Sequence, residues 1–346
     1  MNKLYLSDRP YDFITCAAGE GVYDALASAG YGMRKSCRNG VCEICESRLI
    51  EGKAHQRYPE INFDVQKGEP PALCFPCTLM PITDLRIDIE GLQRPGEIPV
   101  NRVTCEITET EKLNHDVYRV RMAMPETPAH GLPYKAGQYL DIILPSGKQA
   151  SFSIGSAPEQ GRALELHIRH MADSEMSNAI MDHLLNNSTV DIELPKGDCF
   201  LDLHTLNPET RYIFAAASTG FAQIKSVVEH LLANQVKNDI HVYWGARIEE
   251  DMYLEALPFQ WAKEHANVHF DPVLSEPENS PNWQGRTGLL PAAVLEDYAD
   301  FENVEIFTSG SPAMVYALLD AAETKGFSQD NMHSDVFAYA PRPAKS

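Results

Sequence analysis

The pattern of apolar and polar residues changes twice along the chain, which indicates three parts with different folds. In residues 1–91, a helical pattern at 23–29 ends at Gly30 and Gly32, since glycine commonly follows the last turn of a helix. Residues 47–53 predict a strand and a turn, and residues 85–89 alternate as a half-buried strand does. The first part is therefore predicted to be a small, β-rich α+β unit of the β-grasp type.

A second pattern begins after a polar stretch at 92–100, in which Pro95 and Pro99 interrupt regular structure. We interpret this stretch as a linker between domains. Residues 101–207 then form short apolar segments divided by turn residues, as at 117–122 and at 139–144, where a Pro-Ser-Gly turn follows. This pattern predicts a small antiparallel β-barrel.

Residues 208–346 alternate between strand and helix patterns. The apolar run at 212–215 precedes a helical segment at 221–234 with one apolar face, and further strands are expected at 240–244, 268–270 and 304–307. Such alternation predicts a Rossmann-like α/β domain, in which ligands bind beyond the carboxyl ends of parallel strands. Two such strand ends open helices here, at 216–221 and at 308–314. The first offers backbone N–H groups to a phosphate, although an ordinary strand-to-helix turn has the same pattern, and the second is also explained locally by Ser311 as N-cap and Pro312 as the first helical residue.

Composition and charge narrow the classes of partner. Residues 1–96 carry 11 Lys and Arg against 13 Asp and Glu, a net charge of −2, so the remainder carries −18 of the total of −20. Nucleic acids and anionic membranes both need a basic surface, so neither is expected as a partner. No apolar run reaches the roughly 18 residues of a membrane span, and no secretory signal opens the chain, so a cytoplasmic protein is expected.

The most specific chemical signal is a group of cysteines. Four residues separate Cys37 from Cys42, two separate Cys42 from Cys45, and Cys74 follows at a distance. This is the plant-type spacing of a [2Fe–2S] cluster, and Gly40 permits the close backbone approach that such a loop needs. A structural zinc site is the alternative, but zinc sites favour two pairs of closely spaced ligands. The sequence therefore predicts four thiolate ligands to iron.

The other four cysteines show no pairing pattern that would indicate disulfides, which favours a reducing compartment. Cys77 lies close to Cys74 in the sequence, and we interpret it as a small buried thiol and not as a ligand. The four are Cys16, Cys77, Cys105 and Cys199.

The order of these parts resembles ferredoxin-fused flavin reductases of the ferredoxin-NADP⁺ reductase superfamily. These include the reductase components of bacterial multicomponent oxygenases and, most similar, the CDP-6-deoxy-glucoseen reductases. The resemblance extends over nearly the whole chain. It rests on residues 36–45 with Cys74 and on the segments 136–139, 151–154, 166–169, 176–178, 219–222, 243–245, 309–312 and 334–337.

The resemblance implies an N-terminal [2Fe–2S] ferredoxin, a flavin-binding barrel and a nicotinamide-binding domain. NADH or NADPH would give a hydride to FAD or FMN, and single electrons would leave through the cluster to an oxygenase, a dehydratase or another redox protein. Ser153, Ser309 and Phe337 are the expected catalytic residues. The expected cofactor-binding residues are Ser151, Phe152, Ser153, His167, Ile168, Arg169, Met176, Ser177, Asn178, Thr219, Gly220, Phe221, Arg247, Gly310, Ser311, Pro312 and Phe337.

Several positions depart from the family's motifs. Ala150 stands where an arginine binds the flavin phosphate, which leaves Lys148 or Arg169 as candidates to supply that charge. In the nicotinamide half, alanine and serine replace two glycines and Ser309 replaces a cysteine. These departures keep open an alternative function, that of a redox adapter or regulatory protein with impaired nicotinamide chemistry. The remaining departures are Ser174 and Glu43, which both stand at glycine positions, and Gln223, which stands at a proline position; Ala217 and Ser218 are the replaced glycines.

Overall fold

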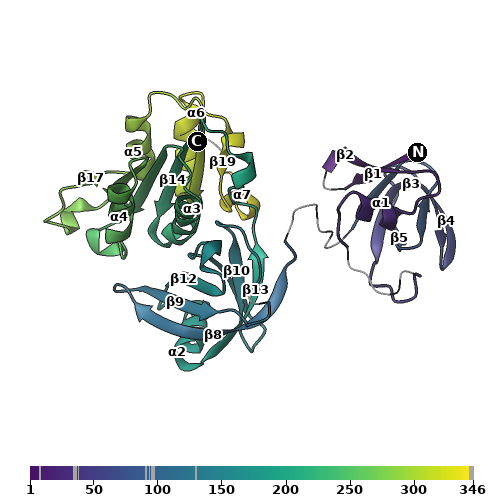
Figure 1. The fold of residues 1–346 in the computed structure, drawn as a ribbon, viewed down its shortest axis with the longest axis horizontal. Helices are drawn as coiled ribbons and strands as arrows, with labels where there is room; N and C mark the ends of the chain where they lie inside the picture. The colour runs from purple at the N-terminus through teal and green to yellow at the C-terminus, as the bar shows by residue number, and fades with distance from the viewer. Residues whose placement is uncertain are drawn as a thin grey trace. The chain divides into compact units, whose positions relative to one another are not determined.

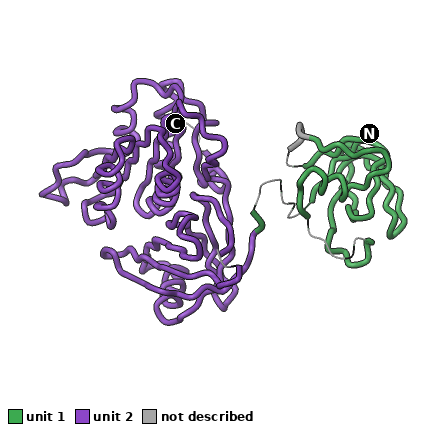
Figure 2. The backbone as a smooth tube through the Cα atoms, in the orientation of Figure 1, with its two compact units in different colours: residues 1–99 green, residues 100–346 purple. Residues whose placement is uncertain are grey.

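The structure is a computed structural model that describes residues 1–7, 9–33, 37, 39–89, 92, 94, 98–128 and 131–342. It divides into two compact units, residues 1–99 and residues 100–346 (Figure 2). The linker expected at 92–100 includes residues 93 and 95–97, which lie outside the described residues, as do Ser36 and Arg38 of the cysteine loop. Among the described residues, no helix has the length and apolar character that crossing a membrane requires.

The first unit is a mixed sheet crossed by one helix, as the sequence predicts. The strand order is β2-β1-β7-β3-β4, with β5 and β6 both paired to β3. Strands β1 and β2 are antiparallel, whereas β1 and β7 are parallel, and the helix buries its apolar face against them. The elements are β1 (Asn2–Leu6), β2 (Arg9–Cys16), α1 (Val22–Ser28), β3 (Ser47–Arg57), β4 (Glu60–Val65), β5 (Ala72–Cys74), β6 (Leu79–Pro81) and β7 (Leu85–Asp88).

The second unit begins with the predicted antiparallel barrel. Its strand order is β11-β10-β13-β8-β9-β12, and contacts between β11 and β12 show that the sheet curls on itself. Inward-facing residues such as Val120, Leu140 and Ile192 form its core. The elements are β8 (Asn101–Lys112), β9 (Val117–Ala123), β10 (Tyr139–Ile143), β11 (Gln149–Ser153), β12 (Ala163–Arg169), α2 (Glu175–Asn186) and β13 (Thr189–Lys196).

The rest of the second unit is a parallel sheet of order β17-β16-β15-β14-β18-β19 with helices on both faces (Figure 1). Residues of β14 alternate between the two layers: Phe214 packs with α3 and α4, and Ile213 packs with α5 and α6. The elements are β14 (Arg211–Ala217), α3 (Phe221–Ala233), β15 (Ile240–Ala246), α4 (Ala256–Glu264), β16 (Val268–Leu274), β17 (Arg286–Thr287), α5 (Leu290–Asp297), β18 (Val304–Ser309), α6 (Pro312–Glu323), β19 (Met332–His333) and α7 (Val336–Tyr339).

Candidate cofactor sites

The cysteine loop is shaped to hold thiolates. The Sγ atom of Cys37 accepts a hydrogen bond from the backbone N–H of Cys42 at 3.4 Å. Hydrogen bonds from the backbone N–H of Asn39, from the thiol and the backbone N–H of Cys42, and from the backbone N–H of Val41 lower the pKa of Cys37 to about 6. Gly40 has φ of +83°, and a Cβ there would lie 2.4 Å from the carbonyl oxygen of Tyr58. A loop of N–H groups around a thiolate suits an iron–sulfur cluster, whose sulfur atoms accept such hydrogen bonds.

A second thiol, Cys77, lies against this loop. Its Sγ atom is 3.2 Å from the Sγ atom of Cys45. Burial, followed by the hydrogen bond with Cys45 and the nearby charges of Cys45 and Cys37, raises the pKa of Cys77 to about 12. When thiols lie this close, the negative charges of their thiolates would repel one another, so they do not all ionise readily. A bound metal centre removes this penalty because its positive charge neutralises the thiolates. The donor set Cys37, Cys42, Cys45 and Cys77 therefore fits a four-thiolate cluster.

Cys74, the fourth ligand expected from the sequence, lies in a core strand and not in the cysteine loop, which favours Cys77 in its place. It is the last residue of β5 and is fully buried in the apolar core of the first unit. Burial raises the pKa of its thiol to about 12. The apolar run at 72–75 already indicated a core strand, whereas Cys77 follows Pro76 in the turn after it. That contrast is the signal the sequence interpretation missed.

A cavity of about 810 Å³ lies in the second unit, between β10 and β11 of the barrel, residues 197–199, the end of β18 and the C-terminal segment 332–339. It brings together six residues that the sequence assigned to cofactor binding or catalysis, although they come from distant parts of the chain. These are Ser151, Phe152, Ser153, Ser309, Gly310 and Phe337. The wall also contains residues that the sequence interpretation did not select, among them Tyr139, Gly197, Asp198, Cys199, Gln223 and Asp335.

The charges expected at the flavin phosphate are already paired. The Nζ atom of Lys148 lies 2.7 Å from Glu175 Oε1, and the Nε atom of Arg169 lies 2.6 Å from Asp116 Oδ2. Neither residue lines the cavity. Ala150 shares a strand face with Phe152, because residues two apart in β11 point the same way. An arginine at position 150 would therefore lie beside the aromatic ring of Phe152. Among the described residues that line the cavity, there is no lysine or arginine that could take its place.

The segment at the start of α2 is held by its own hydrogen bonds. Ser177 Oγ accepts a hydrogen bond from the N–H of Met171 at 2.9 Å, and the amide of Asn178 donates to the carbonyl of Ala172 at 2.8 Å. Met176 packs against the barrel core. These contacts order the loop before the helix, and none of the three residues expected here lines the cavity.

The two strand ends expected to meet a nicotinamide nucleotide lie against each other. In the β14–β18 pair, Ala216 is opposite Ser309. A Cβ on Gly220 would lie 2.2 Å from the carbonyl oxygen of Ser309, and one on Gly310 would lie 3.0 Å from the Cβ of Ala217. The turns containing Thr219 and Gly310 are therefore closely packed at the carboxyl edge of the sheet.

Other residues expected in the nicotinamide site have structural contacts. Phe221 is fully buried and stacks on Trp244 with ring centroids 3.9 Å apart, so its side chain is part of the core that positions the turn before α3. Arg247 is more than half exposed, with Nε 3.5 Å from Asp251 Oδ2. Ser311 Oγ caps α6 by accepting from Met314 N–H at 3.3 Å, and Pro312 is the first helical residue.

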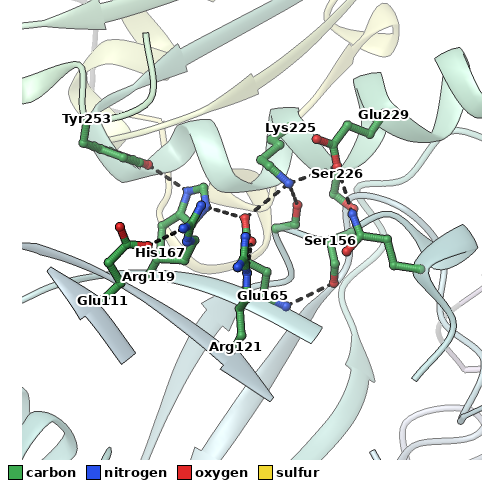
Figure 3. Close-up of polar contacts among 12 residues, drawn as sticks. Glu111, Arg119, Arg121, Ser156, Glu165, His167, Lys225, Ser226, Glu229 and Tyr253 are labelled. Atoms are coloured by element: carbon green, nitrogen blue, oxygen red, sulfur yellow. Dashed lines mark hydrogen bonds and ion pairs between the residues drawn. The ribbon is translucent and has the colours of Figure 1, made fainter. Parts of the chain in front are cut away.

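Two further expected residues, His167 and Ile168, are not among the residues that line the cavity. Ile168 is buried in the barrel core. His167 lies between the barrel and the part of the unit that holds the parallel sheet, with Nε2 3.0 Å from Glu165 Oε1 and Nδ1 3.0 Å from the hydroxyl of Tyr253 (Figure 3). Its side chain is fully buried, and burial lowers its pKa.

His167 belongs to a polar seam formed by Glu165, His167, Lys225 and Glu229 (Figure 3). Lys225 of α3 places Nζ 3.2 Å from Glu165 Oε1, 2.9 Å from Glu229 Oε2 and 3.1 Å from the carbonyl of Gly155. Burial raises the pKa of Glu165, but the hydrogen bond from His167 and the charge of Lys225 outweigh it and hold that pKa well below its usual range. The seam therefore holds α3 against the barrel.

Comparison with known proteins shows which families the parts of this chain match. Models of three families match: the 2Fe-2S iron-sulfur cluster binding domain at residues 8–79, the oxidoreductase FAD-binding domain at 104–200 and the oxidoreductase NAD-binding domain at 214–319. Each model falls on one of the parts described above.

Similar proteins match this chain over nearly their whole length. The chain is 30% identical to the terephthalate 1,2-dioxygenase reductase component 2 of Comamonas sp, over 98% of each chain. It is 29% identical to the CDP-6-deoxy-L-threo-D-glycero-4-hexulose-3-dehydrase reductase of Yersinia pestis, over 91% of this chain and 92% of that protein. The crystal structure of the Amycolatopsis cytochrome P450 reductase GcoB has the same fold, with a TM-score of 0.65, 22% identity and coverage of 96% and 98%.

Proposed function

The chain belongs to the ferredoxin-fused flavin reductases of the ferredoxin-NADP⁺ reductase superfamily, and we propose that it supplies electrons to a separate oxygenase or dehydratase. It is an NAD(P)H-dependent oxidoreductase in which electrons pass from the nicotinamide through a flavin to a [2Fe–2S] cluster. The flavin takes two electrons as a hydride and releases them singly, which a nicotinamide cannot do.

The observation that carries this proposal is the single cavity that joins Phe152 and Ser153 of the barrel to Ser309 and Gly310 of the nicotinamide-binding part. Hydride transfer needs donor and acceptor held close and aligned, and a shared cavity provides one place for both rings. Phe152 and Phe337 offer aromatic faces to a planar ring and exclude water, while the Ser153 hydroxyl offers a hydrogen bond. Their roles are proposed from these positions.

For the cluster we propose the ligands Cys37, Cys42, Cys45 and Cys77. The first three lie on one loop, and Cys77 approaches Cys45 from the turn between β5 and β6. The backbone N–H groups around Cys37 would stabilise the thiolate charge. The division of the second unit near residue 207, into a flavin barrel and a nicotinamide-binding domain, is likewise proposed.

A redox adapter with impaired nicotinamide chemistry remains the second candidate, and the turn at 217–220 favours it. Ser218 has φ of +52°, a left-handed conformation suited to glycine, so its Cβ and hydroxyl occupy a turn that a dinucleotide phosphate would approach. The relatives' names support the reductase, because they describe reductase components of an oxygenase and of a dehydrase.

An anaerobic absorption titration of the purified, flavin-loaded chain distinguishes the two candidates. NADH or NADPH should bleach the flavin band, and the cluster absorption should then change as electrons pass on. Dithionite is the control, since it reduces both centres without nicotinamide chemistry. Bleaching by dithionite but by neither nucleotide would refute the reductase and support the adapter.

A further inference from the structure

The wall of the flavin cavity carries carboxyl groups where a phosphate would need cations. Asp198 and Asp335 both line it, and its described residues include no lysine or arginine. His333 is the histidine on this wall, and its Nε2 atom already lies 3.2 Å from Glu305 Oε2. A flavin phosphate is negatively charged at neutral pH, so it would meet like charges here and not the cationic groups that usually bind it.

The cations that flank this wall in the sequence are already paired with carboxylates. Lys196 directly precedes the wall, and its Nζ atom lies 2.9 Å from Glu193 Oε2 and also pairs with Asp141. Arg342 follows the C-terminal segment, and its Nη1 atom donates to Glu323 Oε1 at 3.0 Å. The lysine and the arginine that the sequence offered for the flavin phosphate are paired in the same way. A phosphate would therefore have to displace a carboxylate from each of these side chains.

The start of α2, the second place at which the family resemblance expects a phosphate, has a carboxylate of its own. Glu175 is in the first turn, where the helix dipole favours a negative charge. Ser174 Oγ accepts a hydrogen bond from the N–H of Ser177 at 3.2 Å, so one of the N–H groups at this helix end is used. Neither this segment nor Ala150 contributes a cation or a part of the cavity lining.

The contacts that the cavity does offer suit the flavin ring. Tyr139, Phe152, Phe337 and Tyr339 line it with aromatic side chains, and Ser153 adds a hydroxyl group. Aromatic faces pack on a planar ring whether or not the ring carries a phosphate. Tyr339 is 66% exposed, so part of this aromatic wall is open to solvent. The wall therefore recognises the part that riboflavin, FMN and FAD have in common.

We propose that the cavity binds a flavin by its ring and not by its phosphates, so that riboflavin, FMN and FAD are interchangeable, and that reduced flavin leaves the chain as a diffusible electron carrier. This inference rests on the proposed function and adds a second route for electrons beside the cluster. A hydrogen bond from a charged group to a phosphate tightens binding by about 10- to 150-fold, and the cavity lacks this contribution. Lower affinity between related complexes arises mostly from faster dissociation, which lets the flavin exchange.

The redox step balances without a further reactant. The C4–H bond of NADH or NADPH breaks, and its hydride forms an N5–H bond on the oxidised flavin. The nicotinamide loses two electrons and becomes NAD⁺ or NADP⁺, while the flavin gains both electrons and one proton and becomes the reduced flavin anion. This anion leaves the cavity, and an oxidised flavin from solution takes its place.

The first test compares riboflavin, FMN and FAD by fluorescence titration of the full chain after its flavin has been removed. We expect their dissociation constants to agree within about threefold, because phosphate recognition would separate them by about tenfold or more. Added salt should not weaken FMN binding, since salt screens an attraction between a cation and a phosphate and none operates here. FMN or FAD bound more than about tenfold tighter than riboflavin would overturn the proposal and leave the reductase function intact.

Ala150→Arg should create the missing selectivity. In this variant FMN should bind about tenfold tighter than riboflavin, and its affinity should fall as salt is added. Leu185→Arg is the matched control, because it places an arginine at a 53% exposed position of α2 that is not part of the cavity lining. The control should leave the three dissociation constants as close together as in the unaltered chain.

Release of reduced flavin is measured without any variant. The full chain, with its cluster, is mixed anaerobically with excess NADH and excess riboflavin and is then separated by ultrafiltration. We expect many equivalents of reduced riboflavin per chain in the filtrate, matching the NADH consumed. At most one equivalent, in a chain whose bound flavin NADH still bleaches, would overturn the proposal alone. A flavin-loaded chain that neither nucleotide bleaches would refute the proposed function, and this inference with it.

Discussion

The Sγ atoms of Cys45 and Cys77 lie 3.2 Å apart, although the two residues are 32 positions apart in sequence. Strand β3 explains the proximity, because it begins two residues after Cys45 and pairs with both β5 and β6, which flank Cys77. Two hydrogen bonds fix the turn: Phe75 N–H donates to Gln56 Oε1 at 2.7 Å, and Thr78 Oγ1 donates to the carbonyl of Tyr58 at 3.0 Å. The pairing of these strands therefore places the Cys77 thiol beside the cysteine loop.

The first prediction follows from this pair. Cys77→Ser should remove or strongly destabilise the cluster, because a thiolate ligand is lost. Cys74→Ala should keep the cluster and should destabilise the first unit by about 1 kcal/mol, as a small core truncation does. Iron content and the visible absorption of each purified variant measure the difference. Loss of the cluster in Cys74→Ala, with retention in Cys77→Ser, would restore the ligand set expected from the sequence.

The second prediction concerns Glu43, whose φ of +57° is left-handed. Glu43→Gly should stabilise the first unit by about 1 kcal/mol, since this conformation is costly for residues with a Cβ. It should also raise the reduction potential of the cluster, because a negative charge beside it is removed. Thermal unfolding and a redox titration measure the two effects. Glu46→Gln, which removes a nearby exposed charge, should raise the potential without the gain in stability.

The third prediction is that flavin is held weakly and is partly lost in purification, because Lys148 and Arg169 are already paired. Ala150→Arg should tighten flavin binding by about 1.5 to 3 kcal/mol, the range of a hydrogen bond to a charged group. Ala150→Gln is the uncharged control and should give a smaller gain. Fluorescence titration with FAD and with FMN measures affinity, and an unchanged dissociation constant in Ala150→Arg would place the phosphate elsewhere.

The fourth prediction tests the nicotinamide contact. Ser309 lines the cavity at the end of β18, where the family has a cysteine. Ser309→Cys should change the rate of hydride transfer more than the affinity for nucleotide, because a side chain beside the reacting ring affects alignment. Stopped-flow reduction at several NADH and NADPH concentrations separates the two quantities. A change confined to affinity would mean that Ser309 contacts the nucleotide away from the reacting carbon.

The fifth prediction concerns the polar seam in which Glu165 pairs with Lys225. Glu165→Leu should destabilise the second unit by about 3 to 5 kcal/mol, because Lys225 loses a buried partner. Adding Lys225→Met should recover only part of this loss, because it removes the ammonium that lost Glu165 but also takes from Glu229 its partner at 2.9 Å.

The pH dependence of the seam has a defined sign. Because the folded pKa of Glu165 is depressed, its contribution to stability is present above the usual carboxyl pKa of about 4.3 and is lost as the pH falls through the lower folded value. Urea unfolding at several pH values should therefore show the difference between the unaltered chain and Glu165→Leu shrinking in acid. A difference independent of pH would exclude the charge as its cause.

Several structural features were predictable from the sequence because they depend on local patterns. The helix before the cysteine loop, the antiparallel barrel and the parallel sheet all follow from residue periodicity and turn residues, which reflect burial on one face or both. Residues 151–153 and the strand end 309–310, which the sequence selected, line one cavity, and each group stays together because motif residues adjacent in sequence stay together in the fold.

Other contacts were not predictable, because a motif gives position along the chain but not the direction of a side chain. Phe221 and His167 both lie in recognised segments, yet the first packs on Trp244 and the second points into the seam. Gln223 and Asp335 are 112 positions apart in the sequence and yet form a hydrogen bond, which no local sequence pattern predicts.

The sequence by itself determined the order of the parts, the three closely spaced cysteines and the two strand ends that open helices. The tertiary structure decided which distant residue completes each site. Cys74 and Cys77 differ by three positions, but strand pairing buries one in the core and turns the other toward the loop. Such choices depend on packing between residues far apart in the chain, where burial of apolar surface and satisfaction of hydrogen bonds select one partner among several chemically equal candidates.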